Sequence, residues 1–233
     1  FINLTELLKI TNNDFIRTSE DRHKEYVKTV WKKLEKLGDI YLDTYKGWYS
    51  ITDESFIAEN EITTDKKNQK IGPSGDILQW LEEPSYFFRL SKWQDKLLEF
   101  YSKNPDFVKP KSRYNEVIKF VEKGLQDLSI SRTSFSWGIN VPGSSNHIIY
   151  VWLDALFNYI SVLTKNNKFD NYWPADAHIV GKDILRFHAI FWPAFLLSAN
   201  LKLPKKVFAH GWWTIDGEKM SKSLGNVIDP VYL

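Results

Sequence analysis

Apolar residues recur at three- and four-residue steps in the first part of the chain. The residues that share this spacing are Tyr26, Val27, Val30, Trp31, Leu34 and Leu37. Such spacing places them on one face of an amphipathic helix. Thr18 or Ser19 can cap the start of this helix, and Gly38 stands where a helix commonly ends. The pattern therefore predicts a helix that packs one face against a core.

Residues 39–90 show short aromatic runs instead of a helical period. These runs contain Ile40, Leu42, Tyr45, Trp48, Tyr49 and Ile51. A polar stretch over 63–75, rich in lysine, glycine and proline, has the composition of an exposed loop. Two helices are predicted after this β-rich region. Ser91 and Gln94 form the pattern of a capping box at the start of the first helix, and the second helix covers about 112–128.

The last third of the chain alternates between strand and helix patterns. Strands are predicted over 147–152, 177–180 and 207–210. Asp154 can cap a helix after the first strand, and Asp183 can cap a helix after the second. This alternation is the pattern of a parallel sheet with crossover helices. Ligands bind beyond the carboxyl ends of such strands, so that edge of the sheet is the predicted site.

A hairpin is predicted near the end of the chain, where Asp216–Gly217 forms a two-residue turn between short strands. Lys219 and Lys222 follow, three residues apart, among small hydroxyl residues such as Ser221. Two ammonium groups at this spacing suit a loop that clamps the phosphates of a nucleotide and neutralises charge during transfer. Lysine pairs are also common on solvated surfaces, and composition alone leaves both interpretations open.

Two weaker features lie at the predicted edge of the sheet. Gly181 and Asp183 lie at a strand-to-helix turn, where glycine allows close backbone approach and the carboxylate can bind ribose hydroxyls. Asp183 can equally act as a helix cap alone. The second feature is a set of rings, namely Trp152, Tyr159, Phe187, His188 and Trp192. Such rings usually form core, but as a pocket they suit a flexible apolar ligand with a polarizable sulfur.

The composition excludes several classes of protein. The 233 residues are 15% aromatic and 43% hydrophobic, which excludes disorder as the dominant state. A formal charge of +2 does not favour wholesale coating of nucleic acid. The chain has no cysteine, so disulfides and thiolate metal sites are excluded, and its five histidines show no metal-ligand spacing. No apolar run is long enough to span a membrane. A cytoplasmic protein without a metal is expected.

Residues 208–226, which read FAHGWWTIDGEKMSKSLGN, resemble the KMSKS loop of class I aminoacyl-tRNA synthetases. Further blocks resemble the methionyl-tRNA synthetase family, and they are GWY at 47–49, SYFFRLS at 85–91, SISR at 129–132, YVWLDA at 150–155 and HIVGKDILRFH at 178–188. The resemblance covers nearly the whole chain. It implies an α/β fold with the Rossmann-type parallel sheet of a class I synthetase, incomplete here, and an inserted mixed α+β connective domain.

The resemblance implies a reaction of protein biosynthesis. The carboxylate of methionine attacks the α-phosphate of ATP, which binds with Mg²⁺, and pyrophosphate leaves. Methionyl-adenylate then transfers methionine to tRNA(Met). The implied partners are therefore methionine, ATP and tRNA(Met), and no membrane. Since no covalent enzyme intermediate is needed, the protein contributes positioning and charge stabilisation.

The resemblance also implies roles for individual residues. The catalytic residues are Lys219, Lys222 and Arg132. The residues that bind ATP are Gly181, Asp183, Trp213, Lys219, Ser221 and Lys222. The residues that line the methionine pocket are Trp152, Ala155, Tyr159, Ile184, Phe187, His188 and Trp192. The resemblance thereby favours a functional His188 over a histidine that only fills the core.

The chain departs from the family pattern because it contains no HIGH signature, the first motif of the class. The resemblance then implies a middle fragment that lacks half of the ATP site and is inactive on its own. Its expected parts are 1–38, the end of the first half of the Rossmann catalytic domain; 39–145, the connective insertion; 146–211, the second half of the catalytic domain; and 212–233, the KMSKS loop region.

A second departure concerns zinc, which many family members bind through cysteine pairs in the connective insertion. The aligned positions here are Ser50, Asp53, Ile71 and Ser74. Isoleucine cannot ligate a metal, and two hydroxyls with one carboxylate make a poor zinc site. We therefore expect an insertion without structural zinc.

Two other functions stay open at this point. One is another class I aminoacyl-tRNA synthetase, specific for an aliphatic amino acid. The other is a non-catalytic module that binds tRNA or a nucleotide.

Overall fold

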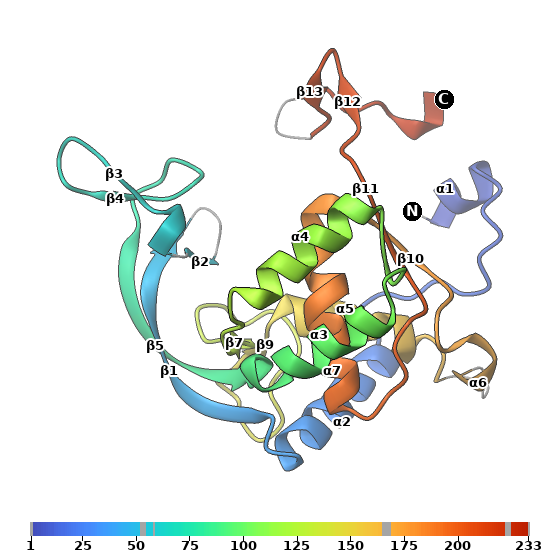
Figure 1. Ribbon diagram of the computed structural model, residues 1–233, viewed down its shortest axis with the longest axis horizontal. Coiled ribbons are helices and arrows are strands. Elements are labelled where there is room, and N and C mark those ends of the chain that lie inside the picture. The colour runs from blue at the N-terminus through green and yellow to red at the C-terminus, as the bar shows by residue number, and fades with distance from the viewer. Residues whose placement is uncertain (1, 52–54, 58, 165–168, 222–224, 233) are drawn as a thin grey trace.

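The computed structural model describes residues 2–51, 55–57, 59–164, 169–221 and 225–232. A body of packed helices and a small parallel sheet carries a long curved β-arm on one side (Figure 1). A short hairpin near the C-terminus stands apart from the body, on the same side as the N-terminal helix α1, Ile2–Leu7. Among the described residues, none of the helices is long and apolar enough to cross a membrane.

The first long helix, α2, covers Asp21–Lys36 and confirms the amphipathic pattern. Its buried residues are His23, Val27, Val30, Trp31 and Leu34. The predicted cap is wrong, because Glu20 takes the N-cap position and makes no capping side-chain bond. The helix ends at Leu37, and Gly38 follows with a φ of +73°, a left-handed conformation that glycine adopts without strain.

The β-arm is built on two long antiparallel strands, β1 (Ile40–Ser50) and β5 (Gln79–Phe88). Their register runs from Ile40 opposite Phe88 to Tyr49 opposite Gln79. Strands β2 (Ser55–Ile57) and β7 (Leu128–Ser129) complete a sheet with the order β2-β1-β5-β7. The far end carries η1 (Glu59–Glu61) and the pair β3 (Thr63–Thr64) and β4 (Lys70–Ile71) (Figure 1). The aromatic runs thus form one continuous ribbon.

Two helices lie between the arm and the rest of the body. They are α3 (Gln94–Lys103), which follows the turn η2 (Leu90–Trp93), and α4 (Lys111–Glu122). The capping box is wrong, because Ser91 Oγ donates to Asp127 Oδ1 at 2.6 Å while Gln94 accepts from the Leu125 N–H at 2.7 Å. The second helix also ends earlier than predicted, since Gly124 has a φ of +101° and breaks it before 128.

The parallel sheet has three described strands in the order β10-β11-β6. Strands β10 (His178–Gly181) and β11 (Val207–His210) lie where the sequence predicts them. Strand β6 (Val108–Lys109) also pairs in parallel with β11, although it lies within the range expected to be the connective insertion. The α/β expectation is confirmed by this sheet and its helices, while the division into 1–38, 39–145, 146–211 and 212–233 stays a prediction.

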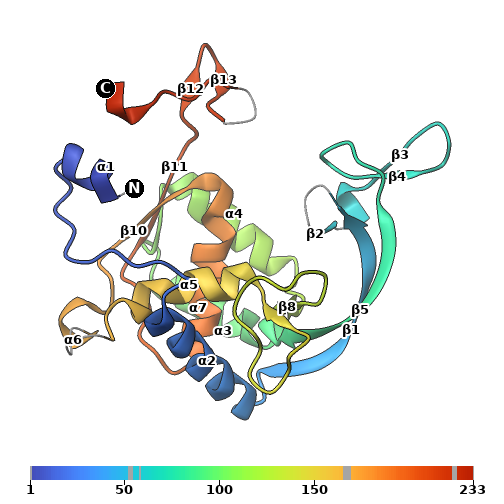
Figure 2. The same ribbon diagram turned by 180° about the vertical axis from the view of Figure 1, so that it is seen from behind.

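Helix α5 (Val151–Ser161) crosses the body beside α2, as Figure 2 shows from behind. It follows a short ladder between β8 (Ser131–Arg132) and β9 (Ile148–Ile149). Asp154 lies inside its first turn and Tyr150 takes the N-cap position, so the predicted cap at Asp154 is wrong. A short helix α6 (Phe169–Tyr172) follows before β10.

The helix predicted after the strand over 177–180 is divided into parts. They are the 3₁₀ turn η4 (Lys182–Ile184), the π-helical segment η5 (Phe187–Phe191) and α7 (Trp192–Ser198). Asp183 lies within η4 and does not cap a helix by its side chain. Local π-helix is rare and is frequent at functional sites. Phe187 and His188, two predicted pocket residues, lie in this segment.

The C-terminal hairpin confirms the turn read from Asp216–Gly217. Strands β12 (Thr214–Ile215) and β13 (Glu218–Lys219) are antiparallel, and the two turn residues have φ values of +51° and +84°. Positive φ at both positions is what a tight two-residue hairpin requires. The turn η7 (Pro230–Tyr232) follows near the end of the chain.

Candidate active site

The carboxyl ends of β10 and β11 lie side by side, since Gly181 pairs with His210 in register. The carboxylate of Asp183 folds back over Gly181. A Cβ at position 181 would lie 2.5 Å from Asp183 Oδ1, which is closer than atoms can approach. Glycine therefore lets the Asp183 carboxylate take this position, and an acidic group stands exposed at the edge where α/β sheets bind nucleotides.

Two lysines converge on one ring beside this edge. Lys182 Nζ lies 3.7 Å from the centre of a Trp212 ring, and Lys219 Nζ lies 4.5 Å from a ring centre of the same residue. A ring face stabilises a nearby cation, so the Trp212 side chain helps to hold both ammonium groups in this region. Two cations here suit an anion such as a phosphate. Lys182 and Trp212 were not among the predicted site residues, and Lys222 lies outside the described residues.

The loop after the hairpin is held by one asparagine. Asn226 Oδ1 accepts from the Ser221 N–H at 2.8 Å, and Asn226 Nδ2 donates to the Lys219 carbonyl at 3.1 Å. The Met220 N–H donates to the Trp213 carbonyl at 2.8 Å. The Trp213 side chain is 73% exposed, so it is not core. The predicted ATP residues Trp213, Lys219 and Ser221 thus share one bonded loop.

The residues predicted for the methionine pocket come together from α5, η4, η5 and α7, and most of them are rings. Trp152 stacks on Phe187 with ring centres 3.7 Å apart and planes 9° apart. Phe187 in turn meets the edge of Phe191 at 5.4 Å. A centre-to-centre distance of 3.7 Å is van der Waals contact, so no ligand atom fits between the stacked rings. Ala155 lies on the same helix, half-buried one turn beyond Trp152.

His188 is fixed at both ring nitrogens within this cluster. Nδ1 lies 2.9 Å from the Ile184 carbonyl, and Nε2 lies 2.8 Å from the Tyr159 hydroxyl. A carbonyl only accepts, so Nδ1 carries the proton and Nε2 accepts from Tyr159. Burial lowers the pKa of His188, although its bond to Ile184 opposes the shift. Burial also raises the pKa of the Tyr159 hydroxyl. Both groups are therefore neutral near pH 7.

The structure adds His178 to the cluster, a residue that the sequence did not single out. Its ring lies 4.3 Å from that of Tyr159 and 5.9 Å from that of His188. The fully buried Trp192 donates its indole N–H to His178 Nε2 at 3.2 Å. Burial, with a smaller contribution from His188, lowers the pKa of His178 to about 4. Its position three residues before Gly181 on the same strand was the available signal.

Arg132 lies buried at the start of α5. Its Nη1 donates to Ser129 Oγ at 2.6 Å and to the Ser131 carbonyl at 2.7 Å, and its guanidinium lies 4.4 Å from the centre of the Tyr150 ring. Tyr150 is the N-cap residue of α5, two positions before Trp152. The catalytic role of Arg132 stays a prediction.

Three of the four aligned zinc positions, Ser50, Ile71 and Ser74, lie among the described residues of the arm. Ser50 Oγ donates to Asp76 Oδ2 at 2.7 Å, and Ile71 lies in β4. Asp53 lies outside the described residues. Within the described ranges no group of three or more histidine, cysteine, aspartate or glutamate residues could hold a metal. The expectation of an insertion without zinc stays a prediction.

The structure thus brings an exposed aspartate at a parallel sheet edge, a lysine-bearing hairpin and a cluster of rings into one region of the molecule, an arrangement that suits a nucleotide and an apolar ligand. Residues 1–233 match the family described as tRNA synthetases class I (M), and the chain belongs to that family. The expected resemblance to methionyl-tRNA synthetases is thereby confirmed.

The chain is similar to curated methionine–tRNA ligases. It is 58% identical to the one from Rickettsia felis and 53% identical to the one from Rhizobium meliloti, and it covers 45% and 46% of those proteins with all of its own length. A solved Mycobacterium tuberculosis methionyl-tRNA synthetase in complex with methionyl-adenylate matches with 50% identity and a TM-score of 0.90, over 100% of this chain and 46% of the other. The chain thus spans under half the length of these relatives.

Proposed function

We propose that the complete protein encoded by the gene for this chain is a methionine–tRNA ligase. It activates methionine with ATP and transfers it to tRNA(Met) in the cytoplasm, where translation uses the product. The observation that carries the proposal is the closed ring cluster around His188, beside the Gly181–Asp183 edge. The chain that builds it is 50% identical to a synthetase solved with methionyl-adenylate.

Adenylation forms a bond between a methionine carboxylate oxygen and the α-phosphorus of ATP, and it breaks the bond to pyrophosphate. Charge on the leaving pyrophosphate must be neutralised, which cations in place before the reaction do best. Lys219 and Lys182 stand beside Trp212 for this role, with Lys222 as the predicted partner and Mg²⁺ arriving with ATP. Asp183 accepts hydrogen bonds from the ribose hydroxyls in this proposal, and its exposed carboxylate beside Gly181 supports that role.

The ring cluster suits the methionine side chain. A thioether packs well against ring edges, and the neutral His188 and Tyr159 place no charge against it. Apolar contact alone distinguishes ligands that differ by one methylene by only about 1–3 kcal/mol. Homocysteine is therefore the competitor that this pocket rejects least well.

ATP–pyrophosphate exchange with a panel of amino acids tests the proposal on the complete protein. Methionine should drive exchange, whereas leucine and isoleucine should not. Exchange driven by leucine or isoleucine and not by methionine would support the other class I synthetase, and no exchange with any amino acid would support a binding module. The inactivity of the isolated 233 residues stays a prediction, and the same assay on the chain alone tests it.

A further inference from the structure

Helix α5 has two functional faces that repeat with the same spacing. Trp152 and Tyr159, seven residues apart, lie on the face that meets the ring cluster. Asp154 and Ser161, also seven residues apart, are displaced from the first pair by two positions. Two residues correspond to about 200° of helical rotation, so the second pair lies on nearly the opposite face. Whatever holds the back of α5 therefore sets the position of the pocket residues on its front.

His23 of α2 bonds to both residues on the back of α5. Its Nε2 lies 2.5 Å from Asp154 Oδ1, and its Nδ1 lies 2.7 Å from Ser161 Oγ. Because a carboxylate only accepts, Nε2 donates to Asp154, while Nδ1 bonds to the Ser161 hydroxyl. One rigid ring thus joins two points that lie two helical turns apart. Rotation or sliding of α5 against α2 would break at least one of these bonds.

This Ser–His–Asp arrangement is not a nucleophilic site. His23 and Ser161 are both 0% exposed, so no substrate reaches the hydroxyl. The partners come from positions separated by 131 and 138 residues, and their effect is to join two helices. A buried polar network in which every member is bonded specifies one arrangement of its elements, since any other leaves groups unpaired.

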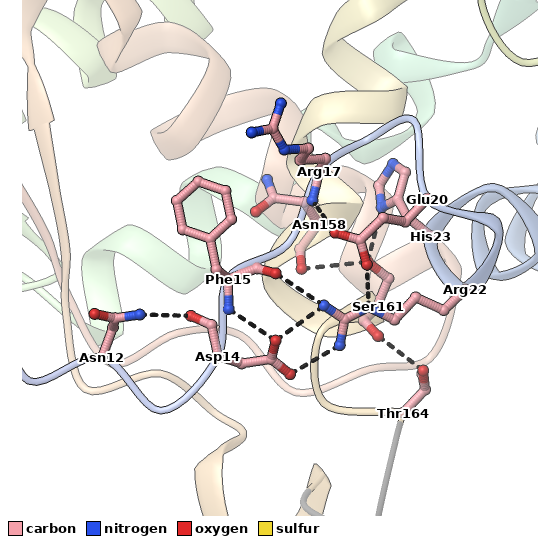
Figure 3. Close-up of polar contacts among 10 residues, drawn as sticks. All are labelled: Asn12, Asp14, Phe15, Arg17, Glu20, Arg22, His23, Asn158, Ser161 and Thr164. Carbon is pink, nitrogen blue, oxygen red and sulfur yellow. Dashed lines mark hydrogen bonds and ion pairs between the residues drawn. The ribbon is translucent and has the colours of Figure 1, made fainter. Parts of the chain in front are cut away.

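The residue before His23 fastens α2 to the segment that precedes it (Figure 3). Arg22 makes a bidentate pair with Asp14 at 2.8 and 2.9 Å, and its Nε donates to Glu20 Oε2 at 2.7 Å. Hydrogen bonding and charge attraction from Asp14 and Glu20 raise the pKa of Arg22, and the Arg17 N–H and Arg22 lower the pKa of Glu20. Neighbouring residues on α2 therefore bond in two directions, Arg22 outward to this segment and His23 inward to α5.

We propose that His23 is a positioning residue for the methionine pocket. By fixing the rotation and the axial position of α5 through Asp154 and Ser161, it sets where Trp152 and Tyr159 stand. The inference rests on the proposed function, because the pocket is assigned there to methionine. It concerns methionine and not ATP, since the predicted ATP residues lie on η4, β10 and the C-terminal hairpin.

Steady-state ATP–pyrophosphate exchange on the complete protein tests this with three variants. His23→Leu removes both bonds and should raise the KM for methionine about tenfold, with kcat and the KM for ATP nearly unchanged. Ser161→Ala removes the bond to His23, together with a longer 3.3 Å bond to the Asn158 carbonyl within α5, and should raise the KM for methionine about threefold. His23→Gln keeps a donor and an acceptor, so it should recover most of the affinity that His23→Leu loses.

Lys28→Ala provides the matched control on the same helix. Lys28 pairs with the exposed Glu25 at 2.8 Å, so its loss should leave all constants unchanged. If His23→Leu does not fold in a thermal unfolding test, the milder Ser161→Ala decides. An unchanged KM for methionine in the folded variants, or equal changes in the two KM values, overturns the positioning role. Wild-type protein without methionine-dependent exchange contradicts the proposed function instead.

Discussion

The ring pocket and the lysine hairpin are built in opposite ways. The pocket is buried, its histidines are bonded, and its rings pack against the core through Trp192. The hairpin is exposed and is held mainly by Asn226 and by the Trp212 ring. In the ring cluster proposed for methionine, Trp152 and Phe187 are in direct contact and the cluster is closed, whereas the lysine hairpin is open to solvent. Substitutions in the ring cluster should therefore mainly lower stability, and substitutions in the hairpin should mainly lower the reaction rate.

Trp192→Ala should produce the largest effect of these substitutions, and the quantity it lowers is the stability of the protein. It removes a fully buried indole from the core and should cost about 3–5 kcal/mol of unfolding free energy, because the cavity cannot close. Urea unfolding of the complete protein measures it. Trp213→Ala in the hairpin is the matched control and should change stability by less than about 0.5 kcal/mol. Equal losses in both variants would contradict the contrast between the regions.

Lys219→Ala should act on the rate alone. Loss of one preorganised cation at the transferring phosphates should lower kcat by about 10²-fold or more, while the midpoint of thermal unfolding stays the same. Exchange kinetics and a thermal scan measure the two quantities. Lys205→Ala, which removes an exposed pair with Asp176, serves as the control and should alter neither. A wild-type rate in Lys219→Ala would remove the lysine from the mechanism.

Tyr159→Phe should change both methionine binding and stability, but modestly. It leaves His188 Nε2 buried without its hydroxyl donor, which costs about 1–3 kcal/mol. We expect a higher KM for methionine and a small loss of stability, with the KM for ATP unchanged. Titration of methionine binding against unfolding measurements separates the two. A change in the KM for ATP alone would show that this hydroxyl does not serve the amino acid pocket.

The ring pocket should contribute to the pH dependence of stability. The ordinary pKa of histidine is 6.5, and burial lowers that of His178 to about 4. Between these values the unfolded chain binds more protons, so the stability from neutral His178 is present above pH 6.5 and is lost as pH falls toward 4. The slope reaches at most about 1.4 kcal/mol per pH unit. His178→Gln keeps an acceptor for Trp192. Its free energy of unfolding, measured with urea at a series of pH values, should depend less on pH over this range. An unchanged slope of this free energy against pH would contradict the assignment.

Local pattern alone determined much of this protein. The face of α2, the strands β10 and β11, the Asp216–Gly217 turn and the lysine loop all follow from spacing and turn chemistry within a few residues. The blocks of residues that resemble the family are likewise continuous stretches of sequence that need no structure to be found. These features are recoverable because helical period, strand period and turn conformation depend on near neighbours.

The tertiary structure decided what distant residues do together. Asp154 reads as a helix cap, but it lies inside α5 and bonds to His23, which is 131 positions away. Ser91 and Gln94 read as a capping box, but each bonds to the segment after α4. A polar side chain takes the partner that buries it best, and that partner is known only when helices pack. Sequence therefore supplied the elements and the chemical groups, while packing chose their partners.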